Sequence, residues 1–201
     1  MFLNQAISAL IQTVLFMTIP FIWWLVTARK RKGFFRWLGW TRIRTDRPRL
    51  LIAATAGTLV AFCALSLLLV PALAGRTGNS IYSGMGWAAL APMLLSALYQ
   101  TSFIEECVFR GFLLKRVGAR FGITAGNIVQ ATLFGLIHMV PFVLQGMSFG
   151  LGLILAVFSG AIGFIAGWIN EHLAGGSLWP SYALHALANV FGAALVLVGM
   201  V

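Results

Sequence analysis

The chain has 201 residues, and 60% of them are hydrophobic while only 9% are charged, which excludes a soluble domain and indicates a polytopic membrane protein. Its net charge is +10, but nine of the fourteen basic residues lie between Arg29 and Arg49. Such a basic block between apolar segments is typical of a topology signal that contacts anionic lipid headgroups, and it argues against a nucleic-acid partner.

Hydrophobic runs divide the chain into about six spans, each long enough for the roughly 20 residues that cross a bilayer core. The chain is therefore predicted to be all-α, a single transmembrane helical bundle. Residues 1–83 would form two N-terminal spans joined by the basic loop, and residues 84–201 would form the core. The predicted spans are 3–28, 50–74, 87–120, 124–139, 146–170 and 178–201.

The connections between the spans have their own signals. Residues 33–49 mix aromatic and basic side chains, which suits a short helix in the membrane interface or, almost equally, a solvated basic loop. Residues 75–84 contain turn-forming residues. Pro141 is predicted to end the fourth span, and residues 170–177 are predicted to form a loop.

The positions of the basic residues also predict an orientation. The 29–49 loop, the 115–120 turn and the 170–177 loop fall on one side of the membrane, whereas the opposite side has only Arg76. Because cytoplasmic loops carry an excess of Lys and Arg, the basic side should be cytoplasmic. An even number of spans then places both termini outside.

Small and amide side chains predict how the helices pack. Ser159, Gly163 and Gly167 repeat every four residues, which favours a close-packed helix face. Asn127 and Gln130 are expected to cap or bridge helices, because amides within a membrane need partners.

Two adjacent carboxylates stand inside an apolar run. Glu106 and Arg110 are four residues apart, so they share a helix face and can pair. Glu105 points about 100° away and is left without that partner. A purely structural ion pair would explain Glu106 and Arg110, but it would leave the second carboxylate unexplained. Charged groups in a membrane are costly, so the cluster is predicted to be functional.

Three more polar side chains lie on other spans. His138 is in the fourth span, and His185 and Asn189 share one helix face in the sixth. Each alone fits a packing or hydrogen-bonding role. Together with the two carboxylates they supply a base, an acid and hydrogen-bond donors, which are the parts of a hydrolytic site. His172, beside Glu171, is expected to be solvated.

Three motifs resemble those of a known family. Glu105-Glu-Cys-Val-Phe-Arg110 is similar to its Glu-Glu-x-x-x-Arg motif, Phe134-Gly-Leu-Ile-His138 to its Phe-x-x-x-His motif, and His185-Ala-Leu-Ala-Asn189 to its His-x-x-x-Asn motif. Their order and spacing resemble the CPBP intramembrane proteases, also called the CAAX protease and bacteriocin-processing (Abi) family. The resemblance covers about residues 84–191.

The resemblance implies hydrolysis of peptide bonds inside a membrane. Glu105 would be the general base for a water that His138 helps to hold, and Glu106 would be oriented by Arg110. The substrate would be a membrane protein or peptide, prenylated or carrying a leader sequence. The expected location is a bacterial cytoplasmic membrane.

The residues leave open whether the site binds a metal ion. The resemblance implies that His185 and Asn189 donate hydrogen bonds to the tetrahedral oxyanion, and a mechanism that requires no cofactor is expected. A zinc site formed by Glu105, His138 and His185 is the alternative, although no His-Glu-x-x-His spacing is present. Other classes of function are a small transporter, and a non-catalytic scaffold or immunity protein built on the same bundle.

Overall fold

The computed structural model describes the backbone of residues 1–73 and 80–200, and the side chains of residues 1–68 and 80–200. Every regular element in this part of the chain is helical, as predicted. The elements are α1 (Phe2–Thr27), α2 (Phe34–Leu38), α3 (Pro48–Leu73), η1 (Ser80–Tyr82), η2 (Gly86–Ala89), α4 (Leu90–Leu94), η3 (Leu95–Phe103), α5 (Ile104–Glu106), η4 (Cys107–Leu114), α6 (Lys115–Phe121), α7 (Ile123–Leu144), α8 (Phe149–Trp168), η5 (Ile169–Leu173) and α9 (Trp179–Leu197).

Six helical segments of the described chain are long and apolar enough to cross a membrane, which confirms the predicted multi-pass bundle. The third runs without interruption from η2 through α6. The segments are Phe2–Thr27, Pro48–Leu68, Gly86–Phe121, Ile123–Leu144, Phe149–Leu173 and Trp179–Leu197.

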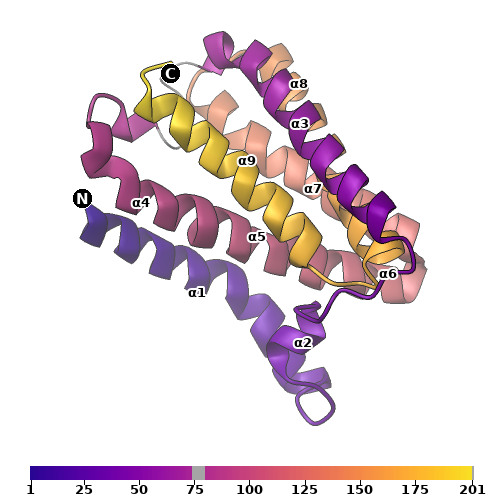
Figure 1. Cartoon of the computed structure of the whole chain (residues 1–201). Coiled ribbons are helices and arrows are strands. Elements are labelled where there is room, and N and C mark those ends of the chain that lie inside the picture. The colour runs from indigo at the N-terminus through magenta and orange to yellow at the C-terminus, as the bar shows by residue number, and fades with distance from the viewer. Residues whose placement is uncertain (74–79, 201) are drawn as a thin grey trace.

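Helix α9 lies in the middle of the view in Figure 1, between the long helix that contains α4 and α5 and the helix α3. Helix α1 runs along the outer side of the α4–α5 helix, and α7 packs along α8. The two N-terminal spans therefore flank opposite sides of the helices that follow.

Helix α1 contacts η3 through polar side chains. The Gln100 amide donates to Ser8 Oγ at 3.1 Å and to Gln12 Oε1 at 2.9 Å. Gln5 donates to Gln100 Oε1 and accepts a hydrogen bond of 2.7 Å from the Tyr82 hydroxyl. Because polar groups in a membrane need internal partners, this seam fixes the position of α1 against the core.

The contact between α7 and α8 is close, as the small residues predict. A Cβ atom at Gly163 would lie 3.2 Å from the Phe134 ring, and one at Gly167 would collide with the Asn127 amide. Asn127 and Gln130 each donate a 2.9 Å hydrogen bond to a backbone carbonyl of α8, which confirms that they bridge helices.

Residues 33–49 begin with a helix rather than forming a loop throughout. Helix α2 buries Trp37 and Leu38, so it packs against the bundle. Gly111 makes this contact possible, since a Cβ atom there would lie 3.1 Å from the Leu38 carbonyl.

Two predicted helix ends are wrong. Helix α7 continues past Pro141 to Leu144, because proline removes one N–H group and a membrane helix can be supported by its neighbours. The predicted 170–177 loop is partly helical, since η5 extends to Leu173 and buries Asn170 among hydrogen-bond partners. Part of the predicted 75–84 turn, residues 75–79, lies outside the described residues.

Candidate active site

The two adjacent glutamates lie on a short α-helical segment within the long third helix, between two π-helical segments. Helix α5, which contains Glu105 and Glu106, is flanked by the π-helical segments η3 and η4. In η3 the hydroxyl groups of Thr101 and Ser102 donate to carbonyls five residues earlier, at 3.0 and 2.6 Å. Such side-chain bonds to the backbone distort a helix, and π-helical turns frequently occur at functional sites.

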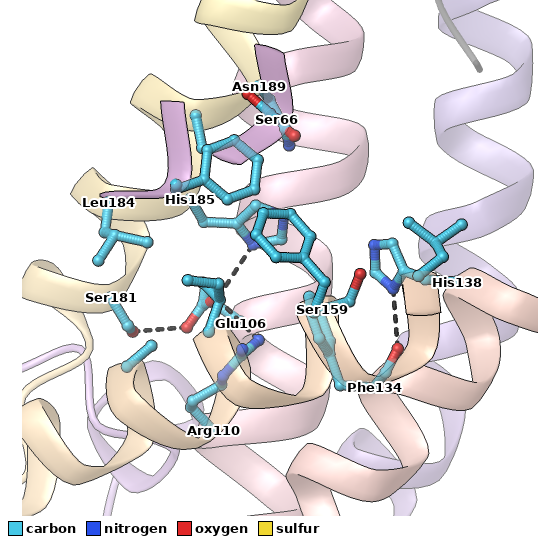
Figure 2. Close-up of a pocket in the computed structure, with 16 residues that line it drawn as sticks. Ser66, Glu106, Arg110, Phe134, His138, Ser159, Ser181, Leu184, His185 and Asn189 are labelled. Carbon is cyan, nitrogen blue, oxygen red and sulfur yellow. Dashed lines mark hydrogen bonds and ion pairs between the residues drawn. The ribbon is translucent and has the colours of Figure 1, made fainter. Parts of the chain in front are cut away.

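Glu106 is the centre of the site. Its Oε1 atom accepts hydrogen bonds from Arg110 Nη1 at 2.9 Å and from His185 Nδ1 at 3.0 Å. Its Oε2 atom accepts a hydrogen bond from the Ser181 hydroxyl (Figure 2). The side chains of Glu106 and Arg110 are only 1% and 2% exposed, so the ion pair predicted from their spacing is present and buried.

A further polar layer supports this carboxylate. Asn170 Nδ2 donates to Ser181 Oγ at 2.6 Å, and the Ser181 backbone N–H donates to Asn170 Oδ1 at 3.2 Å. Asn170 and Ser181 are buried, as is Glu106. The η5 segment and the start of α9 thus fix the Glu106 carboxylate from the side opposite Arg110.

Glu105 has a different environment from its neighbour. Its Oε2 atom is buried and has no hydrogen-bond partner within the described residues. This Oε2 atom lies 3.9 Å from His185 Nε2. One carboxylate of the pair is therefore held by three donors, whereas the other keeps an oxygen for a further partner.

His185 lies between the two carboxylates. Because the Glu106 carboxylate accepts hydrogen bonds, His185 Nδ1 donates the proton in that contact. In the neutral imidazole, Nε2 then carries a lone pair, and this atom is the one that faces Glu105.

His138 reaches the same region from α7. Its Nδ1 atom lies 2.8 Å from the Phe134 carbonyl, which can only accept, so Nδ1 carries the proton and Nε2 is an acceptor in the neutral ring. The Phe134 ring lies 4.5 Å from the His138 ring and 5.7 Å from the His185 ring, measured between centroids. In the described part of the chain, His138 makes no direct hydrogen bond to either glutamate.

Asn189 is held by the π-helical segment. Its Nδ2 atom donates to the hydroxyl oxygens of Thr101 at 2.8 Å and Ser102 at 3.0 Å. Both hydroxyl groups give their own protons to backbone carbonyls, so this arrangement fixes the orientation of the amide. A hydrogen bond from Asn189 to an oxyanion would require exchange of at least one of these contacts.

A cavity of about 180 Å³ joins these side chains. Every predicted site residue except Glu105 lines the cavity. Glu105 is next to one of the lining residues, since its Oε2 atom lies 3.9 Å from His185 Nε2. The other walls are largely apolar and come from α3, α7, α8 and α9. Figure 2 shows His138 and Glu106 on either side of the Phe134 ring.

Comparison with known proteins identifies the family. Residues 86–191 match the family described as type II CAAX prenyl endopeptidase Rce1-like. The chain belongs to this family. No curated protein and no solved structure matches the chain.

The Rce1-like match confirms the resemblance that the three motifs indicate and implies a CAAX-type intramembrane endopeptidase. The matched range contains every predicted site residue. Helices α1 and α3 lie outside it, although α3 contributes to the cavity wall.

Metal-ligating side chains of this Rce1-like protein do not converge on one point. Among the described residues, no group of three His, Cys, Asp or Glu side chains could hold a metal ion. His138 Nδ1 donates to the Phe134 carbonyl, which leaves Nε2 as its available acceptor. The donor set of the predicted zinc alternative is therefore not assembled in this arrangement.

Sequence reasoning did not single out Ser181 or Asn170 as site residues. A signal for the first was available, because Ser181, His185 and Asn189 are spaced by four and share one face of α9. Asn170 gave no such signal, since its contact with Ser181 depends on how η5 meets α9.

Proposed function

We propose that this protein hydrolyses a peptide bond of a membrane-associated substrate with a water molecule activated by Glu105. The observation that supports this role is the contrast between the two carboxylates. Glu106 is satisfied by Arg110, His185 and Ser181, whereas a buried oxygen of Glu105 has no hydrogen-bond donor among the described residues. A carboxylate with a free acceptor in an apolar site suits a general base.

In the proposed reaction, Glu105 Oε2 takes a proton from water as the water oxygen attacks the carbonyl carbon of the substrate. The Nε2 lone pair of His138 is a second acceptor that helps to hold this water. Collapse of the tetrahedral intermediate breaks the C–N bond, and the proton on Glu105 passes to the leaving nitrogen. Glu106 and Arg110 keep His185 in place through the 3.0 Å hydrogen bond to Nδ1.

His185 and Asn189 are the proposed donors to the developing oxyanion. His185 can donate from Nε2 once it is protonated, and its Nδ1 contact with Glu106 stabilises that imidazolium. Asn189 would contribute after exchanging a hydrogen bond with Thr101 or Ser102.

The proposed substrate is a membrane-bound protein or peptide that carries a prenyl group or a leader sequence. The proposed location is a bacterial cytoplasmic membrane, with the 29–49 segment on anionic headgroups. The scattered positions of the possible metal ligands support a mechanism that needs no cofactor over a zinc mechanism.

The test uses the protein in liposomes with a quenched fluorescent peptide that ends in S-farnesyl-Cys-Val-Ile-Met. Glu105→Gln should lower cleavage by at least about 10²-fold, because a general base contributes roughly 10²–10⁴. The matched control is Glu171→Gln, which removes a carboxylate that pairs with Lys115 at 2.7 Å outside the cavity. Near-normal cleavage by the Glu105 variant would rule out the base.

A second arm of the experiment separates the two mechanisms. Strong chelation should leave cleavage by the wild type unchanged, and purified protein should contain no stoichiometric zinc. One zinc per chain, with activity that follows its removal and return, would replace the metal-free proposal by the zinc alternative.

A further inference from the structure

One wall of the cavity comes from a helix that the family match does not include. Phe62 and Ser66 of α3 line the same cavity as Glu106, His138 and His185. Helix α3 precedes the matched range, which starts at residue 86. This part of the cavity wall is therefore built by a helix that lies outside the matched range.

The decisive contact of this wall is between two phenylalanines. The rings of Phe62 on α3 and Phe158 on α8 are stacked, with centroids 5.3 Å apart and planes 23° apart. Both side chains line the cavity and both are only partly buried. They therefore lie at the boundary between the cavity and the outer surface of two membrane-spanning helices.

Helix α3 also packs against η5, α8 and α9. At its other end Leu51 packs in a buried cluster with Ile169 and Leu173, which anchors the helix. Of the residues in its most apolar 18-residue window only 6% are buried, so most of α3 faces outward. The helix that carries Phe62 and Ser66 is thus anchored at one end and borders the cavity further along its length.

We propose that Phe62 and Phe158 form the specificity wall for an apolar side chain of the substrate next to the scissile bond. This inference rests on the proposed function. The cavity of about 180 Å³ is close to the roughly 150 Å³ cavity that accepts a benzene molecule, so it matches one large aliphatic side chain. A prenyl chain is larger, and it would lie outside this cavity in the lipid.

The experiment measures binding without catalysis. Two fluorescent S-farnesyl peptides, ending in Cys-Val-Ile-Met and Cys-Ala-Ala-Met, are titrated onto Glu105→Gln protein in liposomes. Phe62→Trp, which fills the cavity, should lower the preference for the Val-Ile peptide by about tenfold, within the range that one or two apolar groups provide. Phe158→Leu should also change the ratio of the two affinities.

The control is Leu68→Ala, which truncates an apolar side chain of α3 that is 75% exposed and lies outside the cavity. An affinity ratio that stays within twofold in both phenylalanine variants, as in this control, would overturn the proposal. Phe62→Leu replaces Phe62→Trp if the larger residue prevents folding.

Failure of the proposed function would look different from failure of this inference. If wild-type protein cleaves neither peptide but the affinity ratio still depends on Phe62, the specificity wall stands and the hydrolytic role falls. If cleavage is normal and Glu105→Gln abolishes it while the ratio is unchanged, only the wall is wrong.

Discussion

Replacing Arg110 by alanine would leave the Glu106 carboxylate buried without its cationic partner. The two side chains are 2% and 1% exposed and their atoms Nη1 and Oε1 are 2.9 Å apart. Breaking such a buried pair costs about 3–5 kcal/mol. The guanidinium also lies 4.1 Å from the centroid of the Phe134 ring, so a cation–π contact is lost as well.

Two partners remain and limit this loss. The hydrogen bonds from His185 and Ser181 to Glu106 persist, so we expect the free energy of unfolding to fall by about 3–5 kcal/mol rather than by more. At roughly 2–4 °C per kcal/mol for a chain of this size, the midpoint of thermal unfolding should drop by about 6–20 °C.

A buried cysteine provides the assay. Cys107 is buried and Cys63 is partly exposed, so a thiol-reactive dye in a Cys63→Ser background should report the unfolding of the core. The control is Arg120→Ala, an exposed arginine on α6 that should shift stability by no more than about 0.5 kcal/mol. Equal midpoints for the Arg110 and Arg120 variants would refute the argument that Glu106 is a buried charge dependent on Arg110.

Three other predictions concern topology, the polar layer and the α1 seam. Reporter fusions at Gly84 and Gly175 should show opposite sides of the membrane, and equal signals from both would contradict the six-span orientation. Ser181→Ala removes a donor to Glu106 and should lower kcat about tenfold with little change in KM, while Ser181→Thr restores it; an unchanged kcat would exclude a positioning role. Gln100→Leu should reduce the free energy of unfolding by about 1–2 kcal/mol, and a neutral result would mean that the seam with α1 adds no stability.

Features that depend on one helix at a time could be predicted from the sequence. The number of spans follows from apolar length, and the Glu106–Arg110 ion pair follows from helical periodicity. The bridging roles of Asn127 and Gln130 were predictable because an amide within a membrane must find a partner. The end of α7 was not predictable from Pro141 alone, since neighbouring helices support the last turns.

Relations between helices were decided by the tertiary structure. The sequence indicates that His185 and Asn189 share a face, but their partners Glu106 and Thr101 depend on the rotation and depth of α9 against the long third helix. The same packing brings Phe62, far from any motif, to the cavity. Hydrophobicity and helical period specify which residues lie on one helix face, whereas tilt and rotation, set by contacts with neighbouring helices, decide which faces meet.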